Sequence, residues 1–514
     1  MNSKSRFLVP SLADVFFLCL FLFLSLDGGK KLLSDAGTGF HIRTGQYIIA
    51  HLSVPRYDVF SHITPPLPWF AHEWLSAVIM ASIHHVFGLT GIVLFFSFLI
   101  SLTYFLLFKF GRANGGNLVF AALVVFLAVV SSTFHWLARP HIFTLFLALL
   151  WYYVLESYHR SDKNYLFLLP LTMLLWVNLH GGFIIGFVLL AIYLAGCATE
   201  ALFAAAPRNS LSKSKFRTLT CIAFACLLFS LVNPAGYEVL LFPFKLVLNQ
   251  SLVNIMTEYQ SPDFHESHWF KYLLLLTIAI LAISRAKVNL IEVALVLVFT
   301  YMALYSVRHI PLFAIIIAPV LIRHMDSILE HSSGKLAQSL KERSHNLAFI
   351  DGRLRGHFWP LAALLLIGIL AGTGTIKFDF DEATIPVAGV QFLKREKIAG
   401  NMYNPEQFGD YVIYAAWPAY KVFIDGRIDM YGTDRAKEYL NVTMAQPGWE
   451  KILRKYDINF VFHKTNSPIS QLLAQRDDWR LIYADSVANI FVRDSVENQW
   501  VIRKYPNVKP LLNY

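Results

Sequence analysis

The first apolar run of the chain and the polar segment behind it decide the fold: residues 11–45 read SLADVFFLCLFLFLSLDGGKKLLSDAGTGFHIRTG. An apolar run of about 20 residues is long enough to cross a bilayer as a helix. Similar runs recur to about residue 375. Of the 514 residues, 56% are apolar and 15% are charged, against roughly 25% charged in soluble domains. This composition excludes a disordered chain and argues against an ordinary cytosolic enzyme. We therefore expect an α-helical polytopic membrane protein.

The apolar pattern predicts about 11 transmembrane helices. The segment from Ser25 to Lys31 offers no clear cleavage site, so we interpret the first run as a retained span rather than a signal peptide. The predicted spans are 11–27, 90–108, 118–136, 141–157, 165–179, 182–206, 218–234, 270–284, 288–306, 310–323 and 358–375.

The segment 69–87 is ambiguous, because it is apolar on one side but carries polar residues such as His84 and His85. If it lies on the membrane surface and the N-terminus is cytoplasmic, most Lys and Arg of the membrane part fall on the inner side, as topology requires. If it crosses fully, the bias reverses. We therefore predict an interfacial or re-entrant segment in a multi-pass protein of the inner membrane.

Two domains are expected. Residues 1–375 form the transmembrane domain, with a first outer loop at about 28–89, and residues 376–514 form an extracytoplasmic α/β domain. The apolar runs 421–424, 459–463, 479–483 and 488–493 predict strands in that C-terminal domain, and the patterns at 387–397, 408–417 and 448–456 predict helices between them.

Charge and cysteine content exclude several classes of function. The net charge of +10 arises in short loops of the membrane part, where it fixes topology, so it does not indicate a nucleic acid partner. The 4 cysteines all lie in apolar runs, which excludes a disulfide framework and a Cys-based zinc site.

Polar residues gather at the outer ends of the predicted spans. Ionisable groups near membrane depth are costly, so their convergence on one face is a hypothesis of function. Carboxylates, imidazoles and guanidinium groups together suit acid–base chemistry and anion binding. The candidate catalytic residues are Asp35 and Asp58, and the candidate substrate-binding residues are His41, Arg43, His72, Glu73, Arg139, His141, Asn178, His180, Arg308 and His309.

Each of these residues also has a structural interpretation. An aspartate is a frequent helix cap or turn residue, a polar residue at a span end satisfies carbonyl groups, and Asn178 with His180 precedes two glycines that favour a packed bend. His72-Glu73 lacks the second histidine of a zinc-protease helix, because position 76 is serine. In the tail, we favour a buried structural turn for Asp425, Arg427 and Asp429.

Several phrases together resemble the GT-C superfamily of membrane glycosyltransferases, and in particular a bacterial branch of it, with an architecture like that of glycosyltransferase family 39 or like that of the oligosaccharyltransferases. They are Asp35…Gly39-Phe40-His41-Ile42-Arg43-Thr44-Gly45, Pro55…Asp58-Val59-Phe60-Ser61, Trp69…His72-Glu73-Trp74-Leu75, Arg139-Pro140, Trp176-Val177-Asn178-Leu179-His180-Gly181, Asn233-Pro234 and the tail phrase Val422 to Gly432.

The resemblance implies transfer from a polyprenyl-phosphate-linked sugar at the outer membrane face. It implies that Asp35 serves as base or as ligand of a divalent cation, Mg²⁺ or Mn²⁺. Members of this branch carry a second acid two residues later, where this chain has Gly37. The tail lacks the Trp-Trp-Asp signature of oligosaccharyltransferases, so transfer of a whole glycan to asparagine is not expected.

The resulting hypothesis is a membrane glycosyltransferase that moves a sugar to a glycan, lipid or protein acceptor of the cell envelope. Arg139, Arg308 and Arg43 are suited to neutralise the leaving phosphate, and a single displacement inverts the anomeric centre. The alternatives are a transporter or lipid flippase, and a non-catalytic scaffold in envelope polysaccharide assembly.

Overall fold

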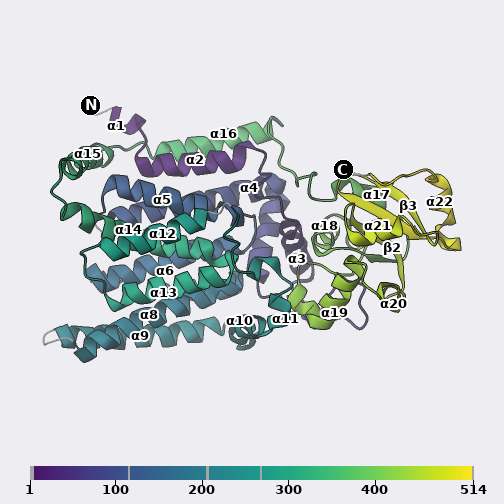
Figure 1. Cartoon of the computed structure of the whole chain (residues 1–514), viewed down its shortest axis with the longest axis horizontal. Coiled ribbons are helices and arrows are strands. Elements are labelled where there is room, and N and C mark those ends of the chain that lie inside the picture. Colours follow the sequence, from purple (N-terminus) through teal and green to yellow (C-terminus); the bar gives the residue numbers. More distant parts are fainter. Residues whose placement is uncertain (1–4, 114–115, 162, 204–207, 267–268, 512–514) are drawn as a thin grey trace.

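The computed structural model describes residues 5–113, 116–161, 163–203, 208–266 and 269–511. It consists of a large helical body and a smaller α/β region at one end of that body (Figure 1). The helices of the body are α1 (Ser5–Leu8), α2 (Leu12–Leu26), α3 (Gly37–His51), α4 (Trp74–Ala113), α5 (Leu118–Ser132), α6 (His141–Ser161), α7 (Leu168–Leu179), α8 (Ile184–Phe203), α9 (Arg208–Ser230), α10 (Glu238–Leu248), α11 (Gln250–Val253), α12 (Trp269–Ile283), α13 (Leu290–Tyr305), α14 (Ile310–Glu330), α15 (Lys335–Asp351) and α16 (Phe358–Gly372).

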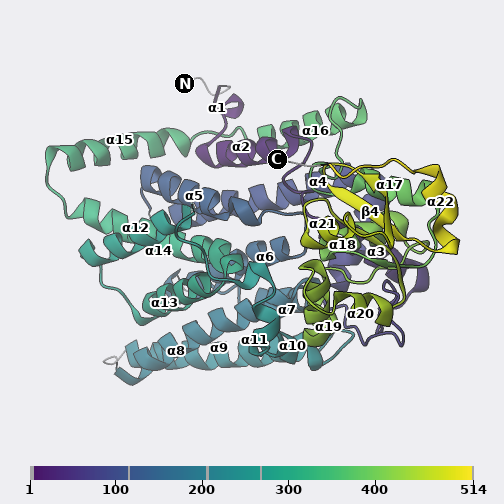
Figure 2. The same ribbon diagram turned by 45° about the vertical axis from the view of Figure 1, so that its right-hand side comes forward.

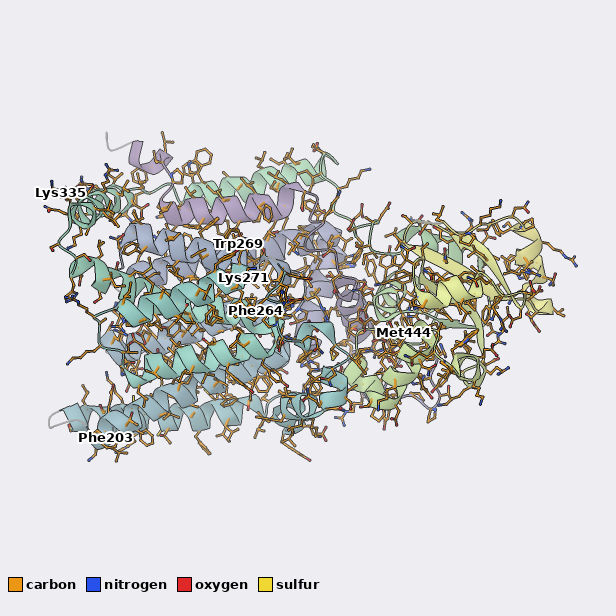
Figure 3. The ribbon with its side chains drawn as sticks, in the orientation of Figure 1. Phe203, Phe264, Trp269, Lys271, Lys335 and Met444 are labelled. Atoms are coloured by element: carbon orange, nitrogen blue, oxygen red, sulfur yellow. The ribbon has the colours of Figure 1, made fainter. Side chains whose placement is uncertain are left out.

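Each predicted span overlaps a helix of the body, and residues 204–206 of the span 182–206 lie outside the described residues. Within the described residues, 5 helices are long and apolar enough to cross a membrane, in α4, α5, α6, α8 and α14, and shorter apolar helices accompany them. Large apolar side chains such as Phe203, which is 86% exposed, stand out from the body (Figure 3). An apolar exterior of this kind suits contact with lipid. The structure thus supports a membrane protein, while the number of crossings and their direction remain predictions.

Helix α14 forms the centre of the body. Its residues from Ile310 to Ile322 are all buried, and it packs against α4, α5, α6, α12 and α13. A helix that is apolar on all sides lies in a protein core or in a membrane, and α14 occupies the core of this body.

The ambiguous segment 69–87 contributes the first part of α4. Gly88 interrupts this helix with a φ of 60° and a ψ of −156°, so residues 74–87 and the predicted span 90–108 have different directions. Only glycine adopts this backbone conformation readily. The structure therefore separates residues 74–87 from the predicted span 90–108, as the sequence analysis did. The depth of residues 74–87 in the membrane remains a prediction.

The connection after α14 lies at the opposite end of the body from the α/β region. It contains helix α15, which runs across the ends of the other helices (Figures 1 and 2). The sides of the membrane on which this connection and the tail lie remain predictions.

The tail contains a four-stranded sheet of order β1-β2-β4-β3. Strand β2 pairs with β1 in parallel and with β4 antiparallel, and β3 pairs with β4 antiparallel. Its elements are α17 (Val387–Glu396), β1 (Asn401–Tyr403), α18 (Glu406–Ala416), α19 (Ile428–Thr443), α20 (Trp449–Lys455), β2 (Ile458–Lys464), α21 (Pro468–Leu473), β3 (Trp479–Ala484), β4 (Ala488–Arg493) and α22 (Gln499–Lys504).

One predicted strand is wrong. The run 421–424 does not join the sheet, and the short strand β1 takes the edge position instead. Val422 pairs with Ser61 of the first outer loop in an isolated bridge, where its N–H donates to the carbonyl of Phe60 at 3.1 Å. The run is apolar because it is buried, but its backbone partner comes from the membrane part of the chain.

Helix α3 joins the body to the tail (Figure 2). It packs against α4 on one side and α18 on the other. A Cβ atom at Gly45 would overlap the carbonyl oxygen of Ala77, and one at Gly39 would lie 2.7 Å from Cβ of Tyr414. These two glycines therefore permit the close helix packing that places the tail over the outer end of the body.

Candidate functional site

A cavity of about 560 Å³ lies where the helical body meets the tail. Its walls come from segments far apart in the sequence: α3, residues 69–77, the start of α6, the turn before α8, α10, the ends of α13 and α14, and residues 410–429 of the tail. Such a cavity has the size of a small-molecule binding site.

Most of the candidate substrate-binding residues line this cavity. The structure brings together the side chains of His41, His72, Glu73, Arg139, His141, His180, Arg308 and His309.

The acidic residue Asp35 stands beside Arg139. Its Oδ2 lies 3.4 Å from Nη1 of Arg139, and its Oδ1 accepts a hydrogen bond of 2.7 Å from the N–H of Gly37. The carboxylate of Asp35 raises the pKa of Arg139 above its usual range, although burial opposes this. A Cβ at Gly37 would lie 2.7 Å from Oδ1 of Asp35 and 3.1 Å from Nε of Arg139. This crowding explains why glycine stands where a second acid was expected.

Glu73 is the centre of a cluster of imidazoles. Its carboxylate oxygens lie 3.5 Å from Nε2 of His41, 3.8 Å from Nε2 of His72 and 3.4 Å from Nε2 of His180. Burial raises the pKa of Glu73 above its usual 4.5, although His72 and Arg139 act in the opposite direction. Burial also lowers the pKa of His41 and His180 well below 6.5, so these rings are neutral. The cluster is therefore suited to exchange protons with a bound hydroxyl group.

The hydrogen bonds around His180 fix its tautomer. Nδ1 of His180 accepts from the N–H of Gly182 at 3.0 Å and lies 2.8 Å from Oγ1 of Thr144. Oγ1 of Thr144 in turn accepts from Nε1 of Trp176 at 2.9 Å. Because Nδ1 is an acceptor, the hydrogen of the neutral ring is at Nε2 and faces Glu73.

A second cation in the cavity lining is Arg308, which lies in the turn between α13 and α14. Nη1 of Arg308 lies 3.9 Å from Oε1 of Glu258, and its guanidinium packs over the ring of Tyr259 at 4.6 Å. The charges of Arg308 and Arg139 lower the pKa of Glu258 below its usual value, although burial alone would raise it. Arg308 and Arg139 thus form a pair of cations that suits a phosphate group.

The tail contributes residues to the cavity lining that are not among the candidate residues. Asp410, Arg427 and Asp429 line the cavity. Burial raises the pKa of Asp410 well above its usual value, and Asp425 adds to this. Burial also raises the pKa of Asp429. The sequence signal for Asp410 was a carboxylate on the apolar face of an amphipathic helix.

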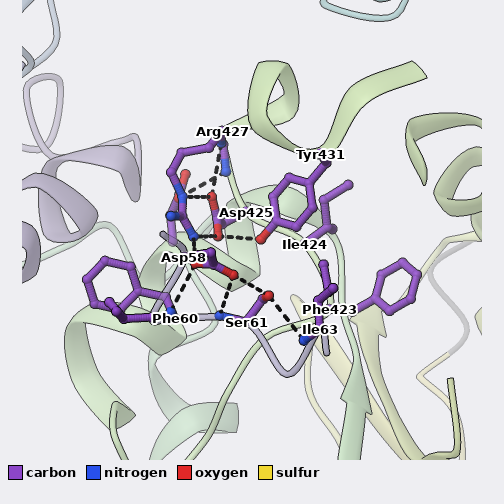
Figure 4. Close-up of polar contacts among 12 residues, drawn as sticks. Asp58, Phe60, Ser61, Ile63, Phe423, Ile424, Asp425, Arg427 and Tyr431 are labelled. Atoms are coloured by element: carbon purple, nitrogen blue, oxygen red, sulfur yellow. Dashed lines mark hydrogen bonds and ion pairs between the residues drawn. The ribbon is translucent and has the colours of Figure 1, made fainter. Parts of the chain in front are cut away.

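Arg427 is held by a buried ion network (Figure 4). Its Nε and Nη2 donate to the two oxygens of Asp425 at 2.8 and 2.6 Å, and Nη2 also donates to Oδ1 of Asp58 at 2.8 Å. The hydroxyl of Tyr431 donates to Asp425 at 2.6 Å. The structural turn expected at 425–429 is therefore present, but it also forms part of the cavity wall.

Four of the candidate residues do not line the cavity. Asp35 lies behind the lining, in contact with the lining residues Gly37 and Arg139, and the other three, Asp58, Arg43 and Asn178, bond to other parts of the fold. Asp58 is 5% exposed, and besides Arg427 its carboxylate accepts bonds from the N–H groups of Phe60 and Ser61. Arg43 donates to the carbonyls of Ile413 and Tyr414, which lie in α18. Asn178 accepts from the indole of Trp74 and donates to the carbonyls of Leu174 and Val232. Asp58, Arg43 and Asn178 form their hydrogen bonds with other parts of the fold, so their geometry indicates structural roles.

The described residues do not form a metal site by themselves. Among them, no group of three or more His, Cys, Asp or Glu side chains is arranged to hold a metal ion. Asp35 is a single carboxylate next to Arg139, whereas Mg²⁺ and Mn²⁺ prefer several oxygen ligands.

The remaining edge of the cavity is apolar and reaches the exterior of the body. Phe244, Val247 and Tyr301 line the cavity and are also 56%, 48% and 67% exposed. They come from α10 and α13. A ligand bound at the two arginines would thus have an apolar path out of the cavity between these helices.

Solved structures of an oligosaccharyltransferase share this fold. The archaeal oligosaccharyltransferase AglB from Archaeoglobus fulgidus, in complex with an inhibitory peptide and a dolichol-phosphate, matches with a TM-score of 0.55 and 11% identity, over 88% of this chain and 70% of that one. The apo form of the Archaeoglobus fulgidus oligosaccharyltransferase matches with a TM-score of 0.54 and 10% identity, over 96% and 75% of the two chains.

No protein-family model matches the chain, and no curated protein matches it in sequence. The chain therefore shares the fold of these oligosaccharyltransferase structures, as the resemblance of its sequence motifs implied. At these identities the similarity establishes the fold, and the chemistry has to be argued from the site.

Proposed function

We propose that this protein is a membrane glycosyltransferase that moves a sugar from a polyprenyl-phosphate-linked donor to an acceptor of the cell envelope, at the outer face of the inner membrane. The observation that carries the proposal is the composition of the cavity. Its lining combines two arginines, carboxylates with neutral imidazoles, and apolar residues that are also exposed. A lipid-linked sugar phosphate needs these three environments together.

The phosphate is proposed to bind between Arg139 and Arg308. Each guanidinium already has one carboxylate neighbour, Asp35 or Glu258, at 3.4 or 3.9 Å. These separations are longer than a strong ion pair of about 2.8 Å, so N–H donors remain for the oxygens of a ligand. As the donor is cleaved, negative charge grows on the phosphate, and fixed cations stabilise it.

A carboxylate is proposed to take the proton of the acceptor hydroxyl. The acceptor oxygen forms a bond to the anomeric carbon, the bond from that carbon to the phosphate oxygen breaks, and polyprenyl phosphate leaves with the electron pair. Asp35 is the proposed base, and Glu73 with its imidazoles holds the acceptor. A single displacement of this kind inverts the anomeric centre, which NMR of the product determines.

The test compares cell envelopes from cells that express the wild type, Asp35→Asn or Asp263→Asn. Asp263 is a matched control, because it is an exposed carboxylate that accepts a bond from the N–H two residues further on, as Asp35 does, but does not pair with Arg139. Loss of a general base lowers a rate by about 10²–10⁴-fold. We expect mass spectrometry to find an added sugar with the wild type and the control, and at least a hundredfold less with Asp35→Asn at equal protein level. Full transfer by Asp35→Asn would refute the role of Asp35, and no added sugar with the wild type would refute the proposed function.

A further inference from the structure

The guanidinium of Arg427 has one donor nitrogen that the fold does not use. Nε and Nη2 are bonded to Asp425 and Asp58, while Nη1 has no hydrogen-bond partner within the described residues. The side chain is only 6% exposed, and the rings of Trp69 and Phe60 pack over it at 4.4 and 5.3 Å. A buried N–H without a partner costs about 1–3 kcal/mol, so such a group in a native fold calls for an explanation.

The position of Arg427 in the cavity lining offers an explanation for this unpaired N–H group. It lines the cavity beside Gly426 and Asp429, and the ion network holds its guanidinium rigidly. Nη1 itself is covered, so an oxygen atom of a ligand in the cavity would reach it after a shift of a neighbouring side chain, while the network keeps the guanidinium in place. The donor is therefore preorganised, which lowers the cost of binding.

The charges of this wall favour a neutral ligand. The charge of Arg427 is already opposed by two carboxylates, Asp425 and Asp58, and Asp410 and Asp429 add two further acidic groups to the same wall. An anionic group would meet net negative charge there, in contrast to the end of the cavity at Arg139 and Arg308. A carbohydrate hydroxyl fits both features, because it accepts from Nη1 and donates to a carboxylate.

We propose that Arg427 and Asp429 form a hydroxyl-binding subsite that recognises a neutral sugar. The proposal rests on the proposed function, since it divides the cavity into a phosphate end in the helical body and a sugar end on the tail. The sugar is that of the donor or that of the acceptor, and both have the same hydroxyl chemistry. The tail thus takes a direct part in substrate recognition.

The experiment measures the thermal unfolding midpoint of the full chain in detergent. The probes are undecaprenyl phosphate alone, the same lipid phosphate carrying glucose, galactose, mannose or glucuronate, and methyl glycosides of the neutral sugars added with undecaprenyl phosphate. We expect undecaprenyl phosphate to raise the midpoint, at least one neutral sugar to raise it further, and glucuronate to add nothing. A further rise with the lipid-linked sugar assigns the subsite to the donor, and one with a methyl glycoside assigns it to the acceptor.

Three variants separate recognition from folding. Arg427→Lys removes the free Nη1 donor, and Asp429→Asn removes a carboxylate that takes no part in the network of Figure 4. The control is Tyr431→Phe, which loses one bond to Asp425 and does not line the cavity. In both subsite variants we expect the apparent affinity for the neutral sugar to fall at least tenfold. Undecaprenyl phosphate should still raise the unfolding midpoint of both variants.

The outcomes are distinguishable. Should undecaprenyl phosphate fail to stabilise the wild type, the proposed function itself fails. Should it stabilise the wild type while no neutral sugar adds to it, or while glucuronate adds as much, the subsite is wrong. If Arg427→Lys does not fold, Asp429→Asn decides alone, and an unchanged sugar affinity in that variant overturns the proposal.

Discussion

At the scale of single residues, the position of a carboxylate decides its chemistry more than its type does. Asp58 and Glu73 are both buried acids of the first outer loop. Asp58 faces a guanidinium and two backbone N–H groups, so its charge is fully compensated. Glu73 faces three imidazoles, two of which are neutral because burial lowers their pKa. Burial raises the pKa of Glu73 while the partners of Asp58 lower its pKa, so Glu73 binds a proton at a higher pH than Asp58 does.

This difference predicts a pH dependence that belongs to Glu73. Burial raises its pKa above 4.5, so Glu73 loses its charge as the pH falls through that raised value. If the charged form holds the acceptor, the rate of transfer falls on the acid side at a higher pH than for an ordinary glutamate. We expect Glu73→Gln to lower the rate by about 10²-fold and to abolish this acid limb in the pH profile.

The matched control is Glu382→Gln, which changes an exposed carboxylate of the tail. It is expected to keep both the rate and the acid limb. A profile for Glu73→Gln that still falls at the same pH would assign the limb to another group, and Asp410 would be the next to test.

Which of these residues the sequence reveals depends on their surroundings in the chain. His41, Glu73 and His180 stand at the ends of long apolar runs, where a polar group is conspicuous. Asp410 lies on the apolar face of an amphipathic helix of the tail, and the packing of α18 against α3 brings it to the cavity. Conversely, Arg43 and Asn178 look like site residues in sequence, but their partners are backbone carbonyls.

At the scale of elements, helices were predictable and backbone pairings were not. A run of about 20 apolar residues has one stable form in a membrane, because a helix satisfies its own backbone groups. The run 421–424 needs a partner strand, and no local signal tells whether that partner is the sheet or Ser61 of the outer loop.

Helix α10 is the element that the proposed donor must pass. It lines the cavity with Phe244 and Val247, and both are about half exposed. We expect Phe244→Asp to weaken the binding of a donor with a long polyprenyl chain at least tenfold, because a charge on the lipid path opposes contact with the chain. A farnesyl analogue, which covers less of α10, should lose less. The measurement is the KM for donors of both lengths.

The control for this prediction is Phe224→Asp in α9. Phe224 lies on the outside of the body and is 62% exposed, but it does not line the cavity. Equal losses for the long and the short donor in Phe244→Asp, or the same loss in Phe224→Asp, would show that α10 is not the path of the lipid.

At the scale of the whole molecule, the site exists only while the tail is docked on the helical body. Arg427 and Asp425 come from the tail and Asp58 comes from the first outer loop, so their network joins the two parts across the cavity wall (Figure 4). Removal of one partner of a buried ion pair costs about 3–5 kcal/mol, because the other charge is left uncompensated. Asp425 still faces Arg427 when Asp58 is absent, so Asp58→Ala belongs at the lower end of this range.

The contribution of Asp58 to stability also has a defined pH dependence. Burial alone would raise its pKa, but Arg427 and the bonds from Ser61 and Phe60 outweigh burial and lower the pKa below 3.8. A lowered pKa stabilises the fold at every pH above the ordinary value, and the stabilisation is lost as the pH falls through the folded value. We therefore expect Asp58→Ala to lower the thermal unfolding midpoint clearly at pH 7 and progressively less below about pH 4. Asp494→Ala, which breaks the more exposed pair with Arg480, should leave the midpoint at pH 7 nearly unchanged. If Asp58→Ala unfolds at the wild-type temperature at pH 7, the tail is docked by other contacts, and the cavity does not depend on this network.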